Sequence, residues 1–266
     1  MGGERMPTGR SGDSTLDRVD LIFGAVQEHG YLTLSEVVDH TGIPRSSAHR
    51  LLTRMVRMRW LLRVGSNYEL GVRLFALGTE GVRNHWFHRI AYPRLRQLHT
   101  RTGYVVHMAY LDGTEAMIWD KLGGGAFGAA VPTRIGTHRP AHQSAVGKVL
   151  LAAETDEFIE GIRHLAPATS RTITDLDLLH GEIAQVRERR FAVDRAESFN
   201  GIGCVATPVL AGVADTSDGH RAVAAISICA PVARIDNRLV APLLAAAADI
   251  TRHASPNPML EHRGGV

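Results

Sequence analysis

Near its N-terminus the chain combines three short helical patterns with one tight hairpin, and few folds accept that order of elements. A first helix can be capped by Ser14 or Thr15 and ends at Gly30. A second helix is expected over Leu34–His40, and a third starts at Pro44, since proline is tolerated at the first position of a helix. Apolar residues recur at spacings of three and four in each segment.

A β-hairpin follows the third helix. Leu61, Leu62 and Val64 precede the turn sequence Gly65-Ser66-Asn67, and a second apolar run begins at Tyr68. Three helices followed by a hairpin are the order of a winged helix-turn-helix, which binds DNA by inserting its recognition helix into the major groove. We therefore expect such a domain over residues 14–76.

Charge within this segment is one-sided. No Asp or Glu occurs between Ile43 and Tyr68, although the whole chain carries a formal net charge of only +3. A local cationic stretch suits a phosphate backbone, but a solvated helix that happens to be rich in arginine would give the same composition. The arginines of this stretch are Arg45, Arg50, Arg54, Arg57, Arg59 and Arg63.

The third helix carries the candidate DNA-reading residues. The N-terminal part of a recognition helix faces the base edges, and the wing contacts the backbone or the minor groove. A surface or capping role is an alternative for His49. The candidate residues are Arg45, Ser46, Ser47, His49 and Arg50 on the helix, with Arg63 and Asn67 on the wing.

The rest of the chain has the pattern of an antiparallel α+β domain. Residues 70–101 read as helical, and Pro93 should interrupt them, which predicts a linker helix over 77–92 and a second domain over 93–254. Two strand pairs, within 105–119 and 202–230, are separated by helical stretches. The helical stretches are Ser144–Ala153, Asp156–His164 and Asp175–Arg190, the last capped by Thr174, and a final helix spans about Asp236–His253.

Composition excludes two broad classes of protein. Hydrophobic residues make up 44% and charged residues 21%, which excludes a disordered chain and a membrane-spanning one. Residues 1–13 lack the apolar stretch of a secretory signal, so we expect a disordered tail there, a flexible tail over 255–266 and a cytoplasmic location. The two cysteines, Cys204 and Cys229, cannot form a disulfide framework and fit a reducing cytosol.

The residues of the second domain allow two other functions. His142, Asp194, Cys204 and Cys229 could gather around zinc, or Cys204 could be a nucleophile with His142 as base and Asp194 as orienting group. No compact ligand spacing supports the zinc site, and a mid-strand cysteine is expected to be inert. We therefore expect neither a metal, a cofactor nor an enzymatic activity.

A glycine-rich segment matches the residue spacing of a nucleotide-binding motif but lacks its structural context. Gly123 to Gly128 match G-x-G-x-x-G, but no helix is expected before Pro132 and no acidic residue follows at the required distance. We expect a flexible loop at the rim of a pocket.

Several segments together resemble the IclR family of bacterial transcriptional regulators. The N-terminal match covers residues 15–75, and the rest extends over almost the whole second domain. The matching segments are TLDRVDLIF, LSEVVDHTGIPRSSAHRLL, YELGVRL, PTRIGTHRPAHQSAVGKVLLA, RTITDLDLL, FAVDRAESFNGIGCVATPV and AAISICAPVARI.

This resemblance implies a winged helix joined by a linker helix to an effector-binding domain with a GAF- or profilin-like sheet. It implies a homodimer or tetramer that binds double-stranded operator DNA under the control of a small organic acid. Cys229 stands where a hydroxyl side chain is more usual. The effector-pocket positions that the resemblance implies are Val131, Ala145, Val146, Asp194, Ile202, Cys204, Ser227 and Cys229.

Overall fold

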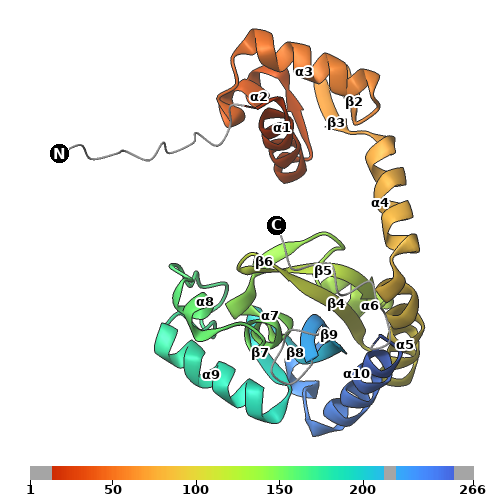
Figure 1. Cartoon of the computed structure of the whole chain (residues 1–266), viewed down its shortest axis with the longest axis vertical. Helices are drawn as coiled ribbons and strands as arrows, with labels where there is room; N and C mark the ends of the chain where they lie inside the picture. The colour runs from red at the N-terminus through yellow and green to blue at the C-terminus, as the bar shows by residue number, and fades with distance from the viewer. Residues whose placement is uncertain (1–13, 213–219, 255–266) are drawn as a thin grey trace, which may run out of the picture. The chain divides into compact units, whose positions relative to one another are not determined.

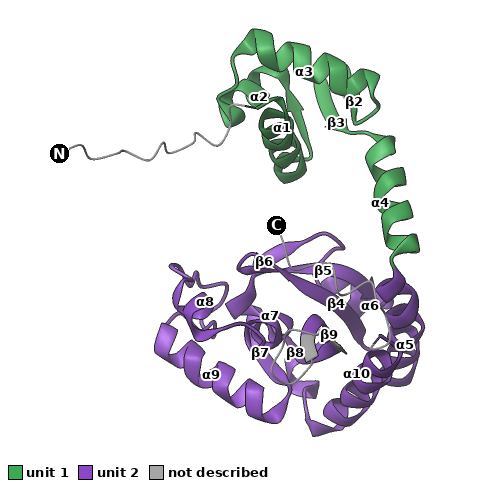
Figure 2. Ribbon diagram, viewed as in Figure 1, with its two compact units in different colours: residues 1–85 green, residues 86–266 purple. Residues whose placement is uncertain are grey.

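The computed structural model describes residues 14–212 and 220–254. It divides into two compact units, residues 1–85 and 86–266 (Figure 2). The tails expected at 1–13 and 255–266, and the end of the loop between the two strands expected within 202–230, lie outside the described residues. Within the described ranges, no helix has the length and apolar character needed to cross a membrane.

The first unit is the expected winged helix-turn-helix (Figure 1). Ser14 and Thr33 cap the first two helices through reciprocal side-chain and backbone hydrogen bonds, and Gly30 and Gly42 end them with positive φ angles. The elements are α1 (Thr15–His29), β1 (Tyr31–Thr33), α2 (Leu34–Thr41), α3 (Arg45–Arg57), β2 (Leu61–Val64), β3 (Asn67–Leu70) and α4 (Val72–Asn84).

Strand β1 is an addition to the expected hairpin. It pairs with β3, which gives a three-stranded sheet in the order β1-β3-β2. Leu32 on β1 and Tyr68 on β3 are partners in this register, and both are buried in the core of the unit. The third strand therefore anchors the wing to the start of α2.

The second unit is built on one antiparallel sheet with the strand order β6-β5-β4-β9-β8-β7. This agrees with the expected α+β class and its hairpin-connected strands. The strands are β4 (Val105–Asp112), β5 (Glu115–Leu122), β6 (His138–Pro140), β7 (Ala192–Phe199), β8 (Ile202–Gly212) and β9 (His220–Pro231). The helices are α5 (Trp86–Thr102), α6 (Gly125–Ala130), α7 (Ala145–Leu151), α8 (Asp156–Glu160), α9 (Leu176–Arg189) and α10 (Val240–Ala254).

Helices cover both faces of this sheet (Figure 1). Because neighbouring residues of a strand face opposite ways, Met108 packs in a cluster with α5 and α10, whereas Ala109 packs in a cluster with α7 and Val186 of α9. The sheet is thus the middle layer of three, with a separate apolar core on each side.

The break in the long helical stretch differs from the sequence expectation. The helix stops at His85, and Pro93 lies inside α5, so the expected interruption at Pro93 was wrong. Apolar residues of α5 on both sides of Pro93 are buried, including Ala91 and Leu95, and this packing holds the helix together across the proline.

Two smaller expectations were also wrong. The glycine-rich segment is not a free loop, because α6 occupies Gly125–Ala130, and Asp175 rather than Thr174 caps α9 through the backbone N–H of Leu178. The segment follows β5, a strand of an antiparallel sheet, and not a parallel strand of a β-α-β unit.

Candidate nucleic-acid interface and ligand pocket

Helix α3 has one apolar face and one cationic face. Ala48, Leu51, Leu52 and Met55 are buried against the core of the first unit. Gly42 turns the chain between α2 and α3 in the left-handed region, with φ at 67°. The residues expected to read DNA lie on the other face: Arg45, Ser46, His49 and Arg50 are exposed, and Ser47 is half-buried.

The candidate DNA-binding arginines differ in how firmly they are held. Arg45 donates from Nη1 to Ser35 Oγ at 3.0 Å, so α2 helps to orient it. Arg63 on the wing donates from Nε to the Gly65 carbonyl oxygen at 3.0 Å, and its guanidinium lies 5.7 Å from the Tyr68 ring centroid. Asn67, where β3 begins, is half-buried. All of these groups belong to α3 and the β2–β3 wing, the elements with which a winged helix contacts a duplex.

The second unit contains a cavity of about 490 Å³, its opening to solvent included. Its wall is formed by the sheet face that packs against α7, together with the segment after α6 and the end of β7. Seven of the eight expected effector residues line it: Val131, Ala145, Val146, Ile202, Cys204, Ser227 and Cys229. Ser144 caps α7, and its Oγ accepts the Gly147 N–H at 3.1 Å.

Asp194, the eighth residue, is outside this wall. It is buried on β7, and its Oδ1 accepts the Glu197 backbone N–H at 2.6 Å. This bond closes a turn in which Ala196 has a positive φ of 68°, and the turn places Ser198 and Phe199 on the cavity. Burial, opposed in part by that hydrogen bond, raises the pKa of Asp194 to about 6.

The structure adds polar groups that the sequence reasoning missed. His107 on β4 is fully enclosed; its Nε2 lies 2.8 Å from Thr133 Oγ1 and its Nδ1 lies 3.4 Å from Cys229 Sγ. Burial lowers the pKa of His107 to about 3, so the imidazole is neutral. Nothing in the sequence separates this histidine from a surface residue, because the alternation of β4 alone does not show what each face packs against.

Arg139 is the cation in the cavity wall. Its Nη2 donates to Gln143 Oε1 at 2.9 Å, and its guanidinium carbon lies 4.5 Å from the centroid of the Phe199 ring. Its Nε is buried and has no hydrogen-bond partner among the residues that the structure describes. Burial lowers the pKa of Arg139 from its ordinary value, although a guanidinium remains protonated. A buried donor without a partner favours an acceptor from a bound ligand.

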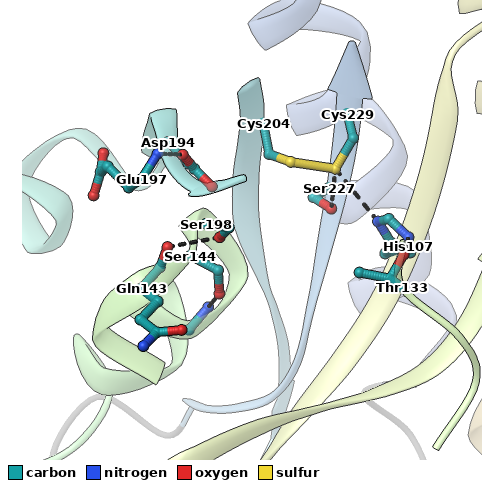
Figure 3. The surroundings of a disulfide bond; sticks show 11 residues. His107, Thr133, Gln143, Ser144, Asp194, Glu197, Ser198, Cys204, Ser227 and Cys229 are labelled. Atoms are coloured by element: carbon teal, nitrogen blue, oxygen red, sulfur yellow. Dashed lines mark hydrogen bonds between the residues drawn. A yellow bond between two sulfur atoms is a disulfide. The ribbon is translucent and has the colours of Figure 1, made fainter. Parts of the chain in front are cut away.

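The two cysteines are joined, which corrects the expectation that they stay unpaired. Cys204 and Cys229 face each other across β8 and β9 and form a disulfide with a Cα–Cα distance of 4.2 Å (Figure 3). The sequence had placed them on partner strands, but only the register shows that they are direct neighbours.

Neither alternative function is assembled by the described residues. Within residues 14–212 and 220–254, no three His, Cys, Asp or Glu side chains gather in a way that could hold a metal ion. Cys204 is bonded to Cys229, and His142 Nε2 lies 3.0 Å from the Ala166 carbonyl oxygen. The proposed nucleophile and base therefore have other partners.

Both lysines of the chain are used inside this unit. Lys148 on α7 is 1% exposed and donates to Glu197 at 2.9 Å and to the Val193 carbonyl oxygen at 2.8 Å, which fixes α7 to β7. Lys121 on β5 donates to the carbonyl oxygens of Gly128, Val131 and Thr133, which fixes the segment after α6. Together they hold two parts of the cavity wall in place.

Comparison with known proteins agrees with both units. Residues 15–65 match the IclR helix-turn-helix domain, and residues 80–255 match the domain described as bacterial transcriptional regulator IclR C-terminal. The chain is 31% identical over 243 residues to the transcriptional repressor IclR of Escherichia coli (strain K12), covering 87% of this chain and 86% of that one. It is 30% identical over 238 residues to the transcriptional regulator XynR of the same organism, covering 87% and 90%.

A solved structure shares the fold. It is an IclR homolog from Microbacterium hydrocarbonoxydans complexed with 4-hydroxybenzoate, with a TM-score of 0.78, 24% identity, and coverage of 90% of this chain and 98% of that one. The two units and these matches therefore define a DNA-binding transcriptional regulator with a helix-turn-helix domain and an IclR C-terminal domain. The chain belongs to the IclR family of bacterial transcriptional regulators.

Proposed function

We propose that the chain binds a pseudo-palindromic operator through α3 and the β2–β3 wing, and that a small organic acid in the cavity changes this binding. Such a regulator works in the cytoplasm, where the bacterial chromosome lies. The observation that carries the proposal is the cationic face of α3, exposed opposite a fully packed apolar face.

The side chains of α3 suit base and phosphate recognition. Arg50 can bind guanine through two parallel hydrogen bonds, and the hydroxyls of Ser46 and Ser47 can reach phosphates or bases. Arg45 and His49 complete the helix surface, while Arg63 and Asn67 contact the backbone or minor groove. In a dimer, two such helices enter successive major grooves about 34 Å apart.

The cavity suits a small acid with an apolar body. Its walls are mostly apolar, and the unpartnered Arg139 Nε supplies a charged donor for a carboxylate. A relative of the same fold is complexed with 4-hydroxybenzoate, a compound of this class. The effector residues are the seven wall positions named above, and Asp194 acts by holding the turn that carries Ser198 and Phe199.

We further propose a homodimer, which can pair into a tetramer. Helix α4 exposes a group of large apolar side chains, namely Val72, Phe75 and Leu77. Monomeric proteins rarely leave such groups in water, and a second copy of the chain is the partner that a palindromic site requires.

Selection from a random duplex pool tests the proposal. Full-length protein should enrich a duplex with two inverted half-sites, and 4-hydroxybenzoate or a related acid should shift its affinity for that duplex. If no duplex sequence is enriched, and the affinity of the protein for DNA varies with salt concentration but not with sequence, an operator-specific regulator is excluded.

A further inference from the structure

The cysteine pair is held together by the sheet, whatever the state of its sulfur atoms. Cys204 and Cys229 are directly opposed, and the pairing of β8 and β9 continues on both sides, through Gly203 with Ala230 and Val205 with Ile228. The two sulfurs therefore stay neighbours when the bond between them is broken. Exchange between dithiol and disulfide needs no movement of the strands.

The pair is also reachable by a small molecule. Both cysteines line the cavity, where Cys229 is 3% exposed and Cys204 is half-buried. A disulfide inside a bacterial cytoplasm is usually catalytic or redox-sensing rather than structural. The position of this one, in the wall of the ligand cavity, favours a sensing role.

A hydrogen-bond acceptor lies beside one of the two sulfurs. In the tautomer whose Nε2–H donates to Thr133 Oγ1, His107 directs the lone pair of Nδ1 at Cys229 Sγ, 3.4 Å away. In the reduced chain this nitrogen can accept a hydrogen bond from the Cys229 thiol, which orients that sulfur, and the thiolate in equilibrium with the thiol is the reactive form of cysteine. Cys204 has no such contact among the residues that the structure describes, so the two thiols differ in reactivity.

We propose that Cys204 and Cys229 are a reversible redox pair that reacts with hydroperoxides entering the cavity and gives DNA binding a second input. The Cys229 thiolate attacks the peroxide, the O–O bond breaks, and Cys229 becomes a sulfenic acid while an alcohol or water leaves. The Cys204 thiol then attacks Cys229 Sγ, the S–S bond forms, and the hydroxyl leaves as water with the thiol proton. A dithiol reductant reverses the change by exchange.

Oxidation changes what the cavity offers to a ligand. The disulfide has no thiol proton, so Cys229 can no longer donate to His107 or to a bound acid, and the two strands become covalently tied at the wall. An effector that binds one state better than the other shifts the protein toward it. We expect operator affinity to differ by about fivefold or more between the two oxidation states, which is the usual scale of coupling between sites.

The test uses the reduced full-length chain, which contains only these two cysteines. After hydrogen peroxide, intact mass should fall by two hydrogen atoms, both alkylation sites should disappear together, and a Cys204–Cys229 linked peptide should be recovered. A dithiol should restore both sites. Independent oxidation of the two cysteines, continued alkylation of both, or links between chains would overturn the redox pair.

Two matched variants identify the attacking thiol. Cys204→Ser should stop at a sulfenic acid on Cys229 that dimedone captures, whereas Cys229→Ser should leave a Cys204 that reacts at least about 10-fold more slowly. Equal rates for the two variants would overturn the role given to His107.

The effect of oxidation on DNA binding is measured separately, as the affinity of each oxidation state for the duplex recovered by selection. Equal affinity of the oxidised and reduced chains would overturn the second input. Failure of the selection itself would count against the proposed function, while the mass measurements would still decide the redox pair.

Discussion

Substitution of single side chains on α3 can show whether its cationic face binds DNA or is only solvated. Arg50 is exposed, carries a permanent positive charge, and has no hydrogen-bond or ion-pair partner among the described residues. Its removal leaves the apolar face of α3 unchanged, so the fold should not respond. Any effect on DNA binding then reports the contact itself.

Arg50→Ala should weaken operator binding about 10-fold or more, the cost of one lost base or phosphate contact. Fluorescence anisotropy of the selected duplex measures it. Arg96→Ala, which removes the same charge from an exposed position on α5, is the matched control and should bind normally. Equal affinities for the two variants would contradict the role of α3.

In the cavity, Arg139 can be tested in the same way, against an exposed arginine as control. Arg139→Ala should reduce affinity for 4-hydroxybenzoate about 10-fold or more, because a charge-assisted hydrogen bond is lost. Isothermal titration calorimetry gives the affinity. Arg134→Ala removes an exposed arginine that does not line the cavity and should leave it unchanged. If Arg134→Ala weakened binding of the acid more than Arg139→Ala, the acid would bind outside the cavity.

Asp194 predicts a pH dependence of stability. Its pKa is about 6 in the folded chain and 3.8 when exposed, so between these values the folded state binds more protons. The free energy of unfolding should therefore fall as pH rises from about 4 to 6. Asp194→Asn keeps an acceptor for the Glu197 N–H and should stabilise the protein by about 2 to 3 kcal/mol above pH 6 but little at pH 4. Denaturant titrations at both pH values, with the cysteine pair kept in one oxidation state, measure the free energy of unfolding. If the Asp194 carboxylate is stabilising, this free energy would instead rise from pH 4 to pH 6.

At the scale of elements, local signals and tertiary packing can be told apart. Ser14, Gly30, Gly42 and Pro44 mark helix ends through their own backbone and side-chain chemistry, and the structure has ends at these places. Pro93 carries an equally strong local signal, yet packing on both sides of it keeps α5 continuous. Boundaries set by distant contacts could not be predicted from neighbouring residues.

The cavity shows the same limit. Its expected residues came from the family resemblance, whereas His107 lies on β4, whose neighbours are set only by the folded sheet. The pairing of Cys204 with Cys229 depends on a one-residue register that no sequence pattern here determines.

Helix α7 packs so closely on the preceding turn that one added methyl group, at Gly147, should destabilise the protein. A Cβ at Gly147 would lie 2.0 Å from the Ala141 carbonyl oxygen, so Gly147→Ala must push α7 away from the preceding turn. We expect it to lower the melting temperature and to weaken effector binding. Gly181→Ala on the exposed side of α9 meets nothing within 4 Å and should stabilise by about 0.5 to 1 kcal/mol. Differential scanning calorimetry compares the two, and equal shifts would contradict the close approach.

For the whole molecule, the oligomeric state decides whether an operator can be palindromic. Phe75 on α4 is 74% exposed, and Phe75→Asp would place a charge in the proposed interface. The variant should be monomeric by light scattering and should lose high-affinity operator binding. Leu178→Asp, at an exposed leucine on α9, should remain assembled. A dimer that survives Phe75→Asp would place the interface on another surface.

The interior use of Lys121 and Lys148 has a chemical consequence for the molecule. Since the sequence has only these two lysines and both ammonium groups are bonded within the second unit, the exposed positive charge of the described chain comes from guanidinium groups. Neither lysine is fully exposed, and the charge facing a duplex persists well above the pH at which a lysine surface would lose it.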